Sequence, residues 1–124
     1  MNIRIMLEGL SSDPSRARHE VQSALDADGY TGDTDGILLL VSELTTNAVR
    51  HGSAPIVLVL DRVGTSVDVS VEDGSLDDVP TVRHHEGDEP SVGGYGLQIV
   101  EQVADAWGWD PTPAGGKRVW FSME

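Results

Sequence analysis

The chain has 124 residues, a length that fits one domain with a sizeable hydrophobic core. Its 21 acidic residues outnumber its 8 lysines and arginines, and the resulting formal charge of −13 argues against a nucleic-acid surface. An acidic body would attract a basic protein partner, although a merely soluble acidic surface has the same charge. Because cysteine is absent, disulfides and thiolate metal sites are excluded, which is compatible with a reducing cytosol.

The N-terminal segment reads as a strand followed by a helix. Ile3 to Leu7 is an apolar run that predicts a first strand. It is far too short for a signal peptide or a membrane-spanning helix, so we expect a cytoplasmic protein without membrane insertion. Asp13 and Pro14 are typical of a cap and first turn, and the helix should continue to about Ala27.

A longer helix follows two separating glycines, Gly29 and Gly32. Asp33 and Asp35 supply capping and dipole-compensating charge at its start, and Gly52 is suited to its end. The buried stripe of this helix is predicted from apolar residues at helical spacing, namely Ile37, Val41, Leu44 and Ala48.

A polar stripe lies beside that apolar one. Glu43 and Asn47 are four residues apart and share one helical face. Arg50 and His51 lie a turn further along and are further candidate nucleotide-binding residues. The amide oxygen of Asn47 could bind magnesium, which usually keeps waters and substrate phosphates as its other ligands. Glu43 could orient or deprotonate an attacking hydroxyl. Taken singly, such residues are more often the solvated face of a helix.

A hairpin is predicted next, with Ile56 to Leu60 and Val67 to Val71 pairing around Gly64. Asp73 lies at the end of the second strand, where its carboxylate could accept a hydrogen bond from the exocyclic amine of adenine. Gly74 would allow the ring to approach the backbone. The alternative is an ordinary Asp-Gly turn after a strand.

Residues 76–92 are acidic, contain two prolines and lack apolar periodicity. A loop of this length in a compact domain is commonly functional, and its position fits a lid that closes over a nucleotide. A disordered acidic insertion is the alternative interpretation.

Three glycines follow this loop immediately before an amphipathic helix that begins near Leu97. Glycines at a helix start let backbone N–H groups meet phosphate oxygens, although a flexible linker has the same composition. Under the nucleotide interpretation, the candidate contact positions are Gly93, Gly94, Tyr95, Gly96 and Leu97. A final strand pair is predicted at Trp107 to Asp110 and Lys117 to Met123, with the tryptophans as packing residues.

Other nucleotide and metal motifs are not matched. The dinucleotide fingerprint would need glycine where Ile99 stands, and a P-loop would need Ser or Thr where Arg118 follows Lys117. A histidine metal site fails on spacing, because the adjacent His84 and His85 would point apart on a strand.

In combination, three segments resemble the ATP-binding domain shared by gyrase, heat-shock chaperones, histidine kinases and MutL. They are VSELTTNAVRHG at 41–52, VEDGS at 71–75 and GGYGLQIV at 93–100. The chain is most similar to the single-domain actinobacterial anti-sigma-factor serine kinases, over roughly residues 10–124. It departs from their pattern at Ser75 and Asp77, where most members have glycine, and at Tyr95, where many have a basic residue.

The resemblance implies a two-layer α/β sandwich of the Bergerat type, in which about three helices cover one face of a mixed, mostly antiparallel sheet. It also implies ATP and Mg²⁺ as ligands, with Asn47 holding the metal, Glu43 as catalytic base, Asp73 reading adenine, and Gly94, Gly96 and Leu97 covering the phosphates. Its partners would be an anti-sigma antagonist and a sigma factor, and the protein would be a homodimer. The alternatives are a binding module without catalysis, with or without ATP, and a slow ATPase.

Overall fold

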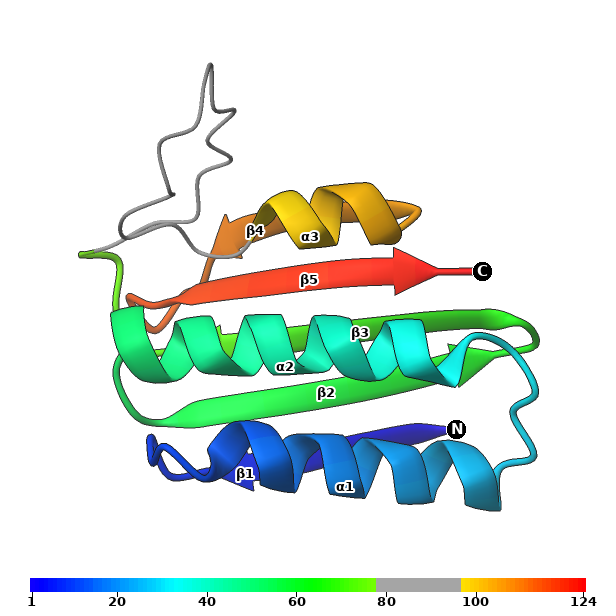
Figure 1. The fold of residues 1–124 in the computed structure, drawn as a ribbon. Helices are drawn as coiled ribbons and strands as arrows, with labels where there is room; N and C mark the ends of the chain where they lie inside the picture. Colours follow the sequence, from blue (N-terminus) through cyan, green and yellow to red (C-terminus); the bar gives the residue numbers. More distant parts are fainter. Residues whose placement is uncertain (78–96) are drawn as a thin grey trace, which may run out of the picture.

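The structure is a computed structural model that describes residues 1–77 and 97–124. Within these residues the chain forms five strands and three helices (Figure 1). In chain order they are β1 (Asn2–Leu7), α1 (Asp13–Ala27), α2 (Thr34–His51), β2 (Ile56–Val63), β3 (Ser66–Asp73), α3 (Leu97–Val103), β4 (Ala106–Pro111) and β5 (Lys117–Met123). Each predicted element is present, with boundaries within a few residues of those expected from the sequence.

The five strands form one sheet in the order β1-β2-β3-β5-β4. Each of its four strand pairs is antiparallel. The turn between β2 and β3 contains Gly64, whose positive φ of 62° is a conformation that glycine adopts without steric cost. In the central β3–β5 pair, Asp73 lies directly opposite Lys117.

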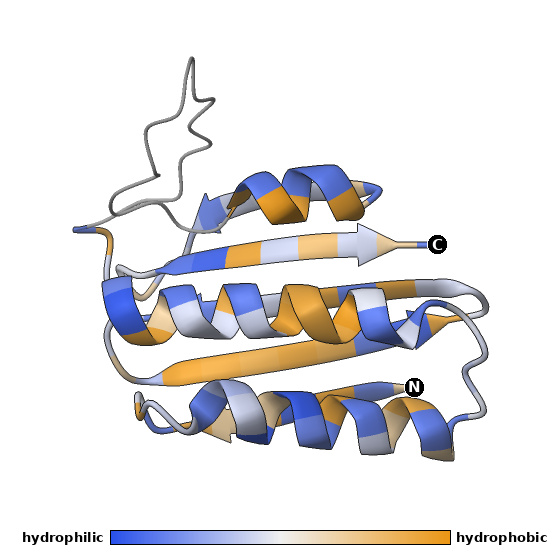
Figure 2. Cartoon of the chain, viewed as in Figure 1, coloured by the Kyte–Doolittle hydropathy of each residue, from blue (hydrophilic) through white to orange (hydrophobic). Residues whose placement is uncertain are grey.

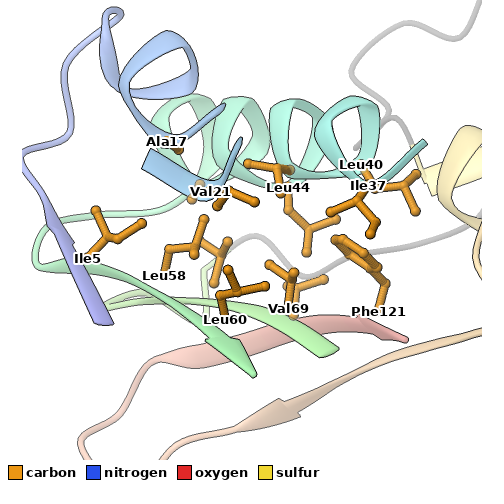
Figure 3. Close-up of a cluster of buried hydrophobic side chains, with 14 of the residues drawn as sticks. Ile5, Ala17, Val21, Ile37, Leu40, Leu44, Leu58, Leu60, Val69 and Phe121 are labelled. Atoms are coloured by element: carbon orange, nitrogen blue, oxygen red, sulfur yellow. The ribbon is translucent and has the colours of Figure 1, made fainter. Parts of the chain in front are cut away.

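All three helices lie on one face of this sheet, which confirms the expected two-layer α/β sandwich (Figure 1). Alternation along β3 and β5 directs one set of side chains toward the helices, and hydrophobic residues follow β2 along most of its length (Figure 2). Figure 3 shows the resulting core, in which α1 and α2 residues face sheet residues. Its fully buried members include Val21, Leu40, Leu60, Val69 and Phe121.

The two long helices begin differently. The Asp33 side chain caps α2 as predicted, because its Oδ1 accepts a hydrogen bond of 2.9 Å from the Gly36 N–H. Asp13 is instead the first residue of α1, and its buried Oδ2 accepts hydrogen bonds from the preceding Gly9 and Leu10 N–H groups. Asp13 thus fixes the connection from β1, whereas Ser12 occupies the cap position.

The three tryptophans lie on the C-terminal strands, β4 and β5. Trp107 and Trp109 pack against the core as predicted, while the Trp120 ring lies beside Gly108 on the neighbouring strand.

The predicted lid, residues 76–92, falls outside the described residues except for Leu76 and Asp77. Across residues 1–77 and 97–124, no helix combines the length and apolar character needed to cross a bilayer.

Candidate functional site

The C-terminal half of α2, the end of β3 and the start of β5 line a small cavity. The end of α2 and the end of β3 lie at the same side of the molecule (Figure 1). The cavity has a volume of about 10 Å³, which is room for about one water molecule. Its lining residues are Leu44, Asn47, Ala48, Val71, Asp73, Lys117 and Val119. The structure therefore brings together Asn47 and Asp73, which the sequence places in separate segments.

Asp73 is the last residue of β3, and only 5 % of its surface is exposed. Its Oδ1 accepts a hydrogen bond of 2.9 Å from the Ser75 N–H, which is the Asx-turn geometry expected of an Asp-Gly-Ser sequence. The following Gly74 N–H donates to the Ser53 carbonyl oxygen at 2.8 Å. These bonds fix the strand end against the residues that follow α2.

Lys117 is the site residue that sequence reasoning missed. Its Nζ lies 3.0 Å from both Oδ1 and Oδ2 of Asp73, and its side chain is 1 % exposed. A signal for this position exists in the sequence, because alternation along β5 places Lys117 on the same face as Val119 and Phe121. A lysine at a core-facing position predicts a buried acidic partner, and Asp73 is directly opposite in the sheet.

Asn47 presents a buried amide that could hold a metal ion. Its side chain is buried, and its Nδ2 atom has no hydrogen-bond partner among the described residues. The amide can be turned so that Oδ1 takes the place of Nδ2, because the two atoms are interchangeable in shape. Residues 1–77 and 97–124 contain no group of three or more His, Cys, Asp or Glu side chains placed to hold a metal. Once turned, the Asn47 amide oxygen could hold a cation whose other ligands are waters and phosphates.

Glu43 lies one helical turn before Asn47 on α2 and is half-buried. Desolvation by this burial raises the pKa of its carboxyl above the ordinary value of 4.5. A carboxylate with a raised pKa binds a proton more readily, which suits a general base. The helix thus carries a basic carboxylate beside a buried amide.

The other predicted site residues are more dispersed. Arg50 is exposed and lines a different groove, together with Ser11, which precedes α1, and Pro14 in its first turn. His51 is half-buried at the end of α2. Leu97 is 1 % exposed and belongs to the hydrophobic core, so its backbone rather than its side chain could face a phosphate. Four predicted nucleotide-covering residues lie outside the described residues and are not placed, namely Gly93, Gly94, Tyr95 and Gly96. The same holds for His84 and His85 of the rival metal site.

Comparisons with known proteins agree with this architecture. The model of the histidine kinase-like ATPase domain family matches residues 11–123. Among solved structures, the crystal structure of the RsbU and RsbW domains of Rv1364c from Mycobacterium tuberculosis superposes with a TM-score of 0.73 at 22 % identity. The match covers 100 % of this chain and 32 % of that one, and at such identity it shows a shared fold. No curated protein sequence matches. The chain belongs to the histidine kinase-like ATPase domain family.

Proposed function

We propose that this protein is an ATP- and magnesium-dependent serine/threonine protein kinase of the anti-sigma-factor type. The observation that carries the proposal is the convergence of Asn47 from α2 and Asp73 from β3 on one cavity, with Glu43 a turn away. By the family resemblance, these three residues would be the metal ligand, the adenine acceptor and the general base, respectively. The proposed protein acts in the cytoplasm.

Two residues of the site would bind different parts of the Mg-nucleotide. Asp73 would accept a hydrogen bond from the exocyclic amine of adenine, and Asn47 would hold Mg²⁺ through its amide oxygen. The 10 Å³ cavity is far smaller than a purine ring, so side chains around it must shift when the base enters. When bound, Mg²⁺ would supply the charge that offsets the triphosphate near this acidic chain.

Glu43 is proposed to act on the protein substrate. Its carboxylate takes the proton of a serine or threonine hydroxyl, and the hydroxyl oxygen forms a bond to the γ-phosphorus. The bond between the γ-phosphorus and the β,γ-bridging oxygen breaks, and its electron pair leaves with ADP. Asn47 and Asp73 contribute by holding the nucleotide in line with that hydroxyl.

The partners are proposed from charge and from family resemblance. With a net charge of −13, the chain attracts basic surfaces and accelerates their encounter at low salt. A basic sigma factor would be the sequestered partner, and a small antagonist protein would be the phosphate acceptor. The proposed assembly is a homodimer.

Calorimetry with Mg-ATP and a phosphotransfer assay test the proposal. Wild type should bind ATP and label a candidate antagonist protein from [γ-³²P]ATP. Glu43→Ala should retain ATP and lose labelling, whereas Asn47→Ala and Asp73→Ala should lose ATP binding. The control is Asp68→Ala, an exposed β3 residue that does not line the cavity. Wild type that binds no ATP would contradict the proposal.

Two further results would identify one of the alternative functions. Partner capture by wild type without phosphate transfer identifies a binding module. Phosphate release from ATP in the absence of any protein acceptor identifies a slow ATPase, in which water takes the place of the hydroxyl.

A further inference from the structure

Lys117 and Asp73 form an ion pair inside the candidate base-binding site. The Lys117 Nζ lies 3.0 Å from each carboxylate oxygen of Asp73 and 2.9 Å from the Ser75 carbonyl oxygen. The two side chains are 1 % and 2 % exposed. All three N–H donors of the ammonium therefore have acceptors, and the pair is shielded from water.

Such a pair is not explained by stability. Removing both charges from water costs several kcal/mol per ion, and well-packed apolar residues of similar volume are often at least as stable. The rest of the same face of β5 follows that apolar rule, with Val119, Phe121 and Met123 buried. A lysine at the one position opposite Asp73 indicates that the carboxylate needs a partner there.

The hydrogen bonds of the Asp73 carboxylate occupy most of its acceptor sites. A carboxylate has about four acceptor sites, two on each oxygen. The sites of Oδ1 are taken by Lys117 Nζ and the Ser75 N–H, and one site of Oδ2 is taken by Lys117 Nζ. Within residues 1–77 and 97–124, no hydrogen bond takes the second acceptor site of Oδ2, and Asp73 lines the cavity.

We propose that Lys117 is a positioning residue that sets the base specificity of this site. It holds the Asp73 carboxylate in one orientation and occupies part of its acceptor capacity, so that the remaining Oδ2 site accepts one N–H from a 6-aminopurine. Guanine presents two adjacent N–H donors on the same edge, and one of them would be left unsatisfied in the buried site. The inference rests on the proposed function, because it requires that the nucleobase reach Asp73.

The test compares two ligands rather than one. Calorimetry would measure Mg-ATP and Mg-purine riboside triphosphate, which lacks the 6-amino group, on wild type and on Lys117→Met. The matched control is Arg118→Met, which removes the same charge one residue along β5, where the guanidinium faces Asp110 at 3.8 Å. Wild type and the control should prefer ATP about tenfold or more, as expected for a hydrogen bond to a charged group. In Lys117→Met this preference should fall toward onefold.

The other outcomes overturn the inference. If Lys117→Met weakens both ligands equally and keeps the preference for ATP, Lys117 has a general structural role. If Lys117→Met binds ATP more tightly than wild type, the lysine obstructs the base instead of positioning its acceptor. Wild type that binds neither ligand overturns the proposed function and this inference with it, whereas an intact preference in Lys117→Met overturns the inference alone.

A second variant covers the case in which Lys117→Met does not fold because Asp73 keeps an unpaired buried charge. Asp73→Leu combined with Lys117→Met removes both charges and the Asp73 acceptor oxygens with little change of volume. This double variant should fold and bind the two ligands with equal affinity. Retention of the wild-type preference for ATP would show that the pair does not read the amine.

Discussion

Gly52 and Asp73 pack so closely that a methyl group on Gly52 would lie 2.5 Å from the carboxyl carbon of Asp73 and 2.6 Å from its Oδ2. Gly52 has a φ of −102°, which any residue can adopt, so glycine is needed here for space and not for conformation. Because Gly52 ends α2 and Asp73 ends β3, this contact joins the helix that carries Glu43 and Asn47 to the candidate base acceptor.

Gly52→Ala should therefore weaken both ATP binding and the fold, because the new methyl group would meet the Asp73 carboxylate and the Ala48 carbonyl oxygen. The added methyl group pushes on the Asp73 carboxylate and shifts its hydrogen bonds, and we expect an affinity loss of about tenfold or more by calorimetry. The free energy of unfolding should fall by about 1–3 kcal/mol. Gly64→Ala is the control, because it introduces strain at a φ of 62° in the distant β2–β3 turn and should cost stability without changing ATP affinity.

Glu43→Gln should separate catalysis from nucleotide binding. The amide cannot take a proton, so phosphate transfer to a protein substrate should fall by about 10²- to 10⁴-fold. Asn47 and Asp73 are untouched, so the dissociation constant for Mg-ATP should stay within a few-fold of wild type. Single-turnover labelling with [γ-³²P]ATP beside calorimetry measures both quantities, and unchanged transfer would exclude Glu43 as the base.

The same variant should change how stability depends on pH. Burial raises the pKa of Glu43 above 4.5 in the folded state, so the folded protein binds this proton more tightly than the unfolded chain does. The stabilising contribution is therefore fully present below the unfolded pKa and is lost as pH rises through the raised folded value. Glu43→Gln should have a melting temperature at or above that of wild type at pH 7, and this difference should disappear below about pH 4. The predicted direction would be contradicted if the variant melted below wild type at pH 7 and the difference between their melting temperatures did not change with pH.

Much of the fold could be predicted from the sequence because its local signals agree with its packing. The apolar spacing of Ile37, Val41 and Leu44 identified the buried side of α2, and Asp33 marked its start. The pairing of β3 with β5 could not be predicted in this way, because no local pattern fixes which strands become neighbours across a sheet. Lys117 was missed for that reason, since its burial has meaning once Asp73 is known to lie opposite.

The Asp33 cap provides a stability prediction that is independent of nucleotide. Asp33→Ala removes the acceptor of the Gly36 N–H at the start of α2, and it should lower the free energy of unfolding by about 1 kcal/mol in urea titrations. Asp35→Ala removes a first-turn acid of the same helix and should cost about 0.3–1 kcal/mol through the helix dipole. Equal effects of the two variants would show that the hydrogen bond to Gly36 adds nothing to the charge effect.

Gly116→Ala should disrupt the site through the backbone of its base acceptor. A methyl group on this buried glycine would overlap the carbonyl oxygen of Asp73, and a backbone atom cannot turn aside as a flexible side chain can. The end of β3 and the start of β5 must then separate. We therefore expect losses of both stability and ATP affinity, with the free energy of unfolding falling by about 1–3 kcal/mol or more. The neighbouring Gly115 has open space around it and a φ of 87°, a conformation that asparagine tolerates. Gly115→Asn should therefore leave ATP affinity unchanged in the same calorimetric assay, and a similar loss in both variants would place the sensitivity in the turn and not in its contact with Asp73.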